Sequence, residues 1–252
     1  MSASASSWPS HTSGEVAAVE ARVAVVPVGA TEQHGPHLPL NTDTLLATDV
    51  AEAIVARTPG TLVGPVVSLG CSSHHLGFPG TVSLRVSTFV ATVVDLCRSL
   101  SAAGFTAVLL NAHGGNRAPL GVAQIELADV RIRAYSFTYW DLLGDVVAEE
   151  LGPAGLSACG HACALETSLM QHLHPDSVRE PLIPADATPA TWPNPHMFSS
   201  DVVQVVRPFE ELKEDGVIGR PSLATPELGQ RLFEAAVERG SREVERIMEV
   251  SA

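Results

Sequence analysis

The amino-acid sequence predicts an α/β fold with a mainly parallel sheet, and three observations support this prediction. Short apolar runs alternate along the chain with segments whose apolar residues recur at helical spacing, an order typical of parallel sheets covered by helices on both faces. The apolar runs are continuous, as expected for strands that are buried on both faces. The 252 residues are 45% hydrophobic and 17% charged, which is typical of a globular protein with a sizeable core.

The first elements follow directly from this pattern. The apolar run at residues 23–28 predicts a buried strand. A helix is expected over residues 44–57, where apolar residues recur at helical spacing, with Thr42 or Asp43 as its N-cap. A second apolar run predicts a strand at residues 61–67.

The middle of the chain continues the alternation. Residues 87–103 predict an amphipathic helix with one continuous apolar face, which Gly104 would end as a C-cap residue. A third strand is expected at residues 107–110 and a helix at residues 119–130. A fourth strand should follow at residues 131–137.

The last third of the chain is less regular. Helices are expected over residues 163–173 and 225–249, the second long and amphipathic. Residues 181–208 are rich in Pro, Thr and Asn and have little periodicity, so we expect an ordered loop or lid there. We expect residues 1–14, rich in Ser and Ala, to be a disordered leader that lacks the features of a secretory signal. Residues 15–252 should form a single domain.

Composition excludes several classes of function. The formal net charge of −13 and the pI of about 5.1 argue against nucleic acid or an anionic membrane surface as the main partner. No apolar run reaches the roughly 18 to 20 residues that span a bilayer. The four cysteines are few and scattered, which favours reduced thiols in a cytoplasmic protein. No Gly-rich nucleotide-binding motif and no G-x-S-x-G nucleophile motif is present.

Several polar loops directly follow the predicted strands. In open α/β sheets, ligands bind beyond the carboxyl ends of the strands, so these loops should meet at one edge. In the first loop, Glu32 and His34 would point to the same side of an extended backbone, and Asp43 follows at a helix start. Carboxylates and imidazoles in this density suit a divalent metal. The alternative is that Asp43 is an N-cap, Glu32 a surface acid and His34 a turn residue.

The later loops add further candidates. His113 ends a predicted strand and precedes Gly114 and Gly115, whose lack of a Cβ lets the backbone turn sharply and approach a ligand; a packed histidine is the alternative. His161 precedes a helix and could act as a proton shuttle. Glu166 lies early in that helix, where a carboxylate is favourable with or without a function.

A third loop has the composition of a substrate rim. Ser73, His74 and His75 lie among small and polar residues, and either histidine could contact substrate or simply be solvated. Trp140 follows the fourth predicted strand. Trp140 and Trp192 are the candidates for an aromatic side chain that stacks on substrate.

Several of these motifs together resemble the creatininase (creatinine amidohydrolase) family. The resemblance rests on the stretch from Pro27 to Asp43, PVGATEQHGPHLPLNTD, on residues 77–81, on residues 111–116 and on His161 with the Glu-Thr-Ser motif at residues 166–168. It covers residues 23–178 in consistent order. The resemblance implies a three-layer α/β/α fold, two divalent metal ions (Zn²⁺, with Mn²⁺ or Fe²⁺ as alternatives) and a homohexamer.

The resemblance also implies roles for single residues. Glu32 and His113 resemble ligands of one metal, His34 resembles a ligand of the other, and Asp43 resembles the bridge between them. His161 looks like the acid that protonates a leaving nitrogen. Creatininase has a Glu two residues after the second-loop His, where this chain has Gly115. Glu166, which could also accept a proton from water, is therefore expected as the remaining ligand.

The function expected from this resemblance is hydrolysis of a cyclic or small non-peptide amide C–N bond by a metal-activated water. The motifs specify the metal chemistry and leave the substrate open, because specificity lies in loops. A peptidase-like or natural-product tailoring hydrolase is an alternative. A non-catalytic metal-binding or scaffold protein is an alternative of another class.

Overall fold

The computed structural model describes residues 7–20, 22–152, 155–185, 193–198, 202–203 and 205–251. Its centre is a four-stranded sheet in the order β2-β1-β3-β4, formed by β2 (Thr61–Val63), β1 (Val23–Val28), β3 (Thr106–Asn111) and β4 (Ala134–Thr138). All three strand pairs are parallel. Val28 is in register with Asn111, and Asn111 with Thr138. The carboxyl ends of β1, β3 and β4 therefore meet at one edge.

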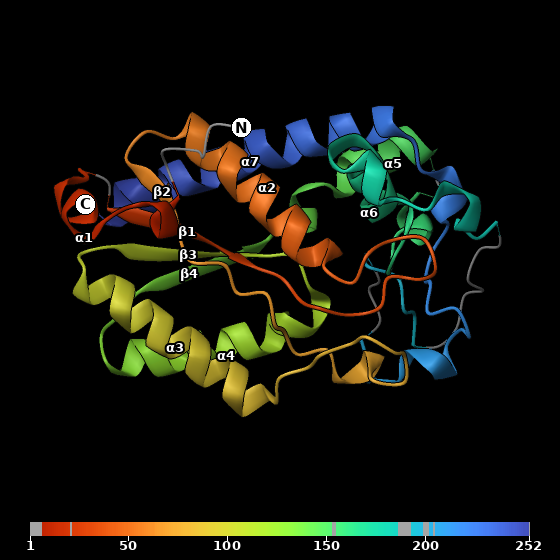
Figure 1. Cartoon of the computed structure of the whole chain (residues 1–252), viewed down its shortest axis with the longest axis horizontal. Helices are drawn as coiled ribbons and strands as arrows, with labels where there is room; N and C mark the ends of the chain where they lie inside the picture. The colour runs from red at the N-terminus through yellow and green to blue at the C-terminus, as the bar shows by residue number, and fades with distance from the viewer. Residues whose placement is uncertain are drawn as a thin grey trace.

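Helices cover both faces of the sheet, as predicted. Figure 1 shows α2 (Thr42–Arg57) and α7 (Pro226–Ser251) over one face and α3 (Val86–Ala102) and α4 (Arg117–Asp129) over the other. The further α-helices among the described residues are α1 (Ser13–Ala18), α5 (Gly144–Leu151) and α6 (Ala164–Leu173). α6 packs against α7 beyond the carboxyl edge of the sheet. The α/β prediction with three layers is confirmed.

The alternation of side chains along β1 explains the two hydrophobic cores. Val23 and Val25 belong to the core under α2 and α7, whereas Ala24, Val26 and Val28 belong to the core under α3 and α4. Successive residues of a strand point to opposite faces, so a strand in the middle of three layers must be apolar at every position. This explains why β1 is a continuous apolar run and is buried along its whole length.

The observed elements differ from the predicted ones mainly at their ends. The second strand ends at Val63 instead of residue 67. Val67 pairs with Val28 only through an isolated bridge. The fourth strand begins at Ala134 instead of residue 131, because Arg131 adopts a left-handed turn conformation with φ of 61°. The helices α1 and α5 were not predicted. Both are short, with 6 and 8 residues.

The chain ends and the late loop are described only in part. Residues 1–6 of the expected leader lie outside the described residues. Of the described residues near this end, Ser7 pairs with Val63, and the Trp8 ring packs edge-on against Phe105 at 4.9 Å. Of the expected loop or lid, residues 186–192, with Trp192, residues 199–201 and residue 204 lie outside the described residues. Among the helices that are described, none is long and apolar enough to cross a membrane.

Candidate functional site

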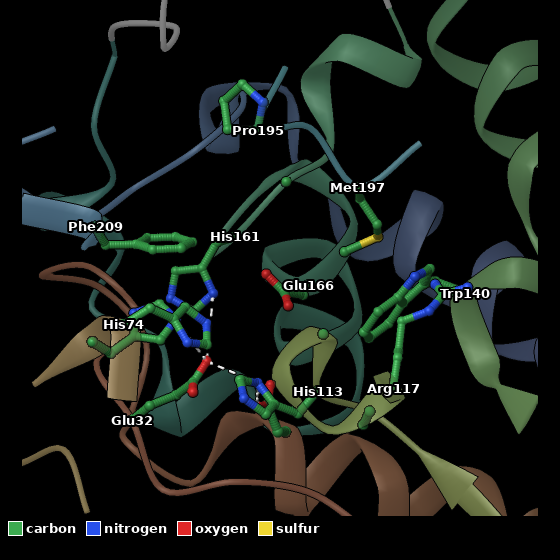
Figure 2. A pocket seen from close by; sticks show the side chains of 15 residues that line it. Glu32, His74, His113, Arg117, Trp140, His161, Glu166, Pro195, Met197 and Phe209 are labelled. Carbon is green, nitrogen blue, oxygen red and sulfur yellow. Dashed lines mark ion pairs between the residues drawn. The ribbon is translucent and has the colours of Figure 1, made fainter. Parts of the chain in front are cut away.

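The predicted chemistry-bearing residues come together beyond the carboxyl edge of the sheet. Six buried side chains meet there: Glu32, His34, Asp43, His113, His161 and Glu166. Five of them line a cavity of about 200 Å³, and the sixth, His34, contacts Asp43. Figure 2 shows Glu32, His113, His161 and Glu166 around a common space. They come from loops after β1 and β3 and from the region of α6, segments far apart in the sequence.

The loop after β1 positions the first two residues. The Glu32 backbone N–H donates to the Leu40 carbonyl, and His34 forms an isolated bridge with Leu38. Between them Gly35 has a φ of +63°, which favours glycine. This tight turn orients both side chains towards the start of α2.

Asp43 lies in the first turn of α2 and is not the N-cap residue. The helix begins at Thr42, and Asn41 occupies the N-cap position without a side-chain capping bond. The carboxylate of Asp43 therefore stays available for the cavity. The partial positive charge of the helix N-terminus stabilises it there.

Hydrogen bonds define which nitrogen of each imidazole faces the carboxylates. Nδ1 of His34 donates to the Glu32 carbonyl at 3.1 Å, which leaves Nε2 facing Oδ1 of Asp43 at 3.0 Å. Nε2 of His113 donates to the Cys71 carbonyl at 3.2 Å. Its Nδ1 lies 3.2 Å from Oε1 of Glu32 and 3.3 Å from Oδ2 of Asp43. Metal-binding histidines are commonly fixed in this way through the nitrogen that does not bind the metal.

The donor atoms form two clusters of three that share Asp43. Glu32, Asp43 and His113 form one cluster, and His34, Asp43 and Glu166 form the other; within each, the donor atoms lie within 4.8 Å of one another. A third combination joins Glu32 and His34 to His161. Carboxylate oxygens and imidazole nitrogens in these numbers suit zinc and related divalent ions.

The electrostatics of the cavity favour a bound cation. Both carboxylate oxygens of Glu32 and Oδ2 of Asp43 are buried without a hydrogen-bond partner, although histidine nitrogens lie 3.2 to 3.7 Å from Oε1 of Glu32. A buried carboxylate oxygen without a hydrogen-bond donor is costly. These acceptors are therefore where a metal ion fits.

The pKa shifts reflect the same crowding of charge. Burial raises the pKa of Glu32 and of Asp43, but His113 beside Glu32 and His34 beside Asp43 outweigh burial and lower both values. Burial lowers the pKa of His34, but the charge of Asp43 raises it to about 10. Burial, reinforced by Cys163, raises the pKa of Glu166 well above its ordinary value. The carboxylates thus need positive charge nearby to remain ionised.

His161 lines the cavity in a fixed orientation. Its Nε2 donates to the Gln33 carbonyl at 2.7 Å, and its Nδ1 faces Oε1 of Glu32 at 3.7 Å. Burial, together with the charge of His34, lowers the pKa of His161 to about 3. The next residue, Ala162, has a φ of +49°, a conformation that costs an L-residue about 1 to 2 kcal/mol. Such backbone strain is found at functional sites.

The residues predicted to contact substrate differ in where their side chains lie. His74 and Trp140 line the cavity, on opposite sides of Glu166 in Figure 2. His75 also lines the cavity but is buried, and is held between the Gln33 amide at 2.9 Å and Oε1 of Glu32 at 3.3 Å. Ser73 lines a neighbouring groove and is absent from the cavity lining.

Sequence reasoning missed several contributors to the site, among them Gln33, Met197 and Phe209. Gln33 binds His75 through its side chain and His161 through its carbonyl group. Met197 and Phe209 line the cavity from the late part of the chain. Gln33 stands beside Glu32 and could have been suspected from that position. No pattern in the sequence marks Met197 or Phe209.

Gly115 occupies a position where a side chain does not fit. A Cβ there would lie 2.5 Å from Nε2 of His113 and 2.8 Å from Cε1 of His74, and closer still to the Cys71 carbonyl oxygen. A ligand cannot extend from this residue without displacing the His113 ring. Glu166, which reaches the cavity from the first turn of α6, lies where it can supply the missing carboxylate.

Comparison with known proteins agrees with this geometry. The family model for creatininase, described as creatinine amidohydrolase, matches residues 9–244. A mycofactocin precursor peptide peptidase of Mycolicibacterium smegmatis is 34% identical over 234 residues, covering 88% of this chain and 84% of the relative. A creatinine amidohydrolase of Pseudomonas putida is 33% identical, covering 87% of this chain and 89% of the relative.

Solved structures match over nearly the whole chain. A crystal structure of creatinine amidohydrolase superposes with a TM-score of 0.80 at 31% identity, covering 96% of this chain and 98% of that one. A creatininase structure with Mn in its title has a TM-score of 0.78 at 31% identity, covering 95% and 97%. A mutant creatininase of Zn-Zn type has a TM-score of 0.78 at 30% identity, covering 95% and 96%.

Proposed function

The chain belongs to the creatininase family of metal-dependent hydrolases that cleave amide C–N bonds, and we propose that it hydrolyses a cyclic or other small non-peptide amide in the cavity of Figure 2. The observation that carries this proposal is the pair of donor clusters joined by Asp43. The cavity of about 200 Å³ suits a small reacting group.

We propose that two divalent ions bind at this centre, with Asp43 as the bridge. Glu32 and His113 would hold one ion, and His34 and Glu166 the other. The donor chemistry suits Zn²⁺, with Mn²⁺ or Fe²⁺ as alternatives. When bound, such ions lower the pKa of a water molecule and polarise the carbonyl oxygen of an amide.

The remaining steps belong to the chain's own residues. Nδ1 of His161 faces the cavity because the Gln33 carbonyl fixes its Nε2. From this position it would take up a proton and deliver it to the departing nitrogen. Glu166 is the second candidate for accepting a proton from water. Trp140 and His74, on opposite sides of the cavity, would orient the substrate.

Substitution of the bridge tests this proposal. We expect Asp43→Asn to lose bound metal and to reduce kcat/KM by at least about 100-fold, since one change disturbs both ions. Glu52→Gln, an exposed acid on the same helix, should keep both properties. Metal content per chain and amide turnover are the measurements. Full metal content with full turnover in Asp43→Asn would contradict the proposal.

A second candidate is a peptidase-like or natural-product tailoring hydrolase. The relative from M. smegmatis, named a mycofactocin precursor peptide peptidase, favours it. A hydrolysis screen over small lactams, formamides and short peptides separates the two candidates by which substrates are turned over. Stoichiometric metal without turnover of any amide would instead support a metal-binding scaffold protein.

We also propose a cytoplasmic homo-oligomer, a hexamer by family resemblance. Val122 and Ile125 are exposed apolar residues on α4, 44% and 66% accessible, and exposed apolar side chains are common at subunit interfaces. All four cysteines are free and buried, which suits a reducing compartment. Sedimentation velocity tests the oligomer, and a monomer at micromolar concentration would overturn it.

A further inference from the structure

A second hollow continues from the catalytic cavity. It is a groove of about 420 Å³ that shares four lining residues with the cavity: His74, Gly114, Pro195 and Phe209. The rings of His74 and Phe209 lie 5.4 Å apart at the junction. One wall comes from α4 and the start of α3, and the other from residues within 193–195 and 205–212.

The walls of the groove are mainly apolar. Among the described lining residues, the one with a permanent charge is Arg207, and Glu211 lies 3.7 Å from its guanidinium. The apolar lining includes Val86, Ala118, Pro119, Val206, Phe209 and Leu212. Val86 and Val206 are 54% and 79% exposed. Apolar side chains gathered in a solvent-open groove mark a binding site for an apolar group.

Size distinguishes the groove from the cavity. Pockets that bury a drug-sized ligand have about 300 to 1,000 Å³. The catalytic cavity, at about 200 Å³, is below that range and holds little more than a reacting group. Cavity and groove together lie within the range. A substrate that fills both must carry a further part beside its amide.

We propose that the groove binds an extended, uncharged apolar arm, an acyl chain that the substrate carries next to the scissile amide. This inference rests on the proposed amide hydrolysis for the identity of the reacting group. The arm itself is recognised by the groove walls, with His74 and Phe209 at the point where the arm leaves the cavity.

Binding of methyl ketones to the metal-loaded full-length protein tests the groove. These compounds present a carbonyl group and have no C–N bond to cleave. We expect affinity to rise by about two- to fourfold for each methylene from 2-butanone through 2-hexanone to 2-octanone, measured by calorimetry. Affinity that does not change with chain length would overturn the proposal.

Two pairs of matched variants locate the effect. Val206→Asp places a charge in the groove, whereas Val202→Asp changes an exposed valine outside the groove lining. Ala118→Trp fills the groove from α4, whereas Glu126→Trp changes an exposed residue of the same helix that lies outside the groove lining. In the groove variants the affinity for the ketones should no longer rise with chain length, and in the controls it should still rise. A gain that survives in both groove variants would overturn the proposal.

Turnover distinguishes this inference from the proposed function on which it rests. If the ketone affinities rise with chain length but no amide is hydrolysed, the groove proposal is supported and the proposed reaction is contradicted. If small amides are hydrolysed but the ketone affinities stay flat, the groove proposal fails alone. Turnover of N-hexanoyl-glycinamide should exceed that of N-acetyl-leucyl-valinamide, and the reverse order would overturn the acyl chain as the occupant of the groove.

Discussion

At the residue scale, two adjacent glycines in the loop after β3 have very different surroundings. A Cβ on Gly114 would meet no atom within 4 Å. A Cβ on Gly115 would collide with the Cys71 carbonyl and with the rings of His113 and His74. The absence of a side chain at Gly115 therefore lets the loops after β2 and β3 approach each other and holds His113 in place.

We predict opposite outcomes for alanine at these two positions. Gly115→Ala should lower the free energy of unfolding by about 1 to 3 kcal/mol, because the neighbours must move, and it should reduce metal content through the displaced His113. Gly114→Ala should change neither value appreciably. Chemical denaturation and metal analysis measure both effects. Equal behaviour of the two variants would contradict this account of the loop.

Much of the candidate centre could be predicted from single residues. Carboxylates and imidazoles at strand ends identified Glu32, His34, Asp43 and His113, because parallel topology brings such loops to one edge. Whether these residues bind metal stays a prediction. Gln33, Met197 and Phe209 were not predicted, since amide, thioether and phenyl groups occur everywhere in proteins and gain a role here only through tertiary packing.

At the scale of elements, α6 and α7 approach closely because of a glycine. A Cβ on Gly229 of α7 would lie 2.5 Å from the Ser168 carbonyl carbon and 2.9 Å from Cβ of His172. Both neighbours belong to α6, the helix that carries Glu166 in its first turn. The position of Glu166 therefore depends on the close backbone contact between α6 and α7 at Ser168 and Gly229.

Alanine substitutions in two helices test this dependence. Gly229→Ala should destabilise the protein by about 1 to 3 kcal/mol, since α7 must shift away from α6. Gly121 lies within α4, and a Cβ there would meet nothing within 4 Å. Gly121→Ala should therefore stabilise by about 0.5 to 1 kcal/mol, through helix propensity alone. Thermal denaturation distinguishes the two; a stabilised Gly229→Ala would show that the helices are not closely packed.

The predicted elements were most accurate where periodicity was strong. β1, α3 and α7 lie within a few residues of their predicted bounds, because each has a long apolar run or face. β2 was predicted too long because regular pairing with β1 stops at Pro65, which has no backbone N–H, after Gly64 has donated to the Val25 carbonyl. The helices α1 and α5 were missed because each has too few residues to show a periodic pattern.

At the scale of the whole molecule, the centre connects separate parts of the fold. Its candidate ligands come from the loop after β1, from α2, from the end of β3 and from α6. A ligand that binds the folded state alone stabilises that state by mass action. Bound ions should therefore stabilise the packing of these segments against one another, in addition to their part in the reaction.

Removal of metal should lower the melting temperature. At an ion concentration 100 times the dissociation constant, binding contributes about 2.7 kcal/mol, which corresponds to roughly 5 to 10 °C for a chain of this size. Differential scanning calorimetry with and without a chelator measures the shift. Asp43→Asn provides the control, since its melting temperature should not respond to the chelator. A shift of the same size in that variant would place the ions elsewhere.

The fold class was predicted from the sequence, but the order of the strands and the packing of the late loop were not. Alternating strands and helices implied a parallel sheet with both faces covered, and this is confirmed. The order β2-β1-β3-β4 could not be read from the sequence, because β1 could pair with any apolar strand. The position of residues 193–198 and 205–212 beside the cavity and the groove was also not predicted, since a loop without periodicity gives no indication of where it packs.

The central claim is that two ions share Asp43, and anomalous diffraction from crystals grown with zinc tests it most directly. We predict two anomalous peaks about 3.5 to 4 Å apart, one beside Glu32 and His113 and the other beside His34 and Glu166, with Asp43 between them. Peaks confined to another part of the molecule, or a single peak that does not contact Asp43, would contradict the account.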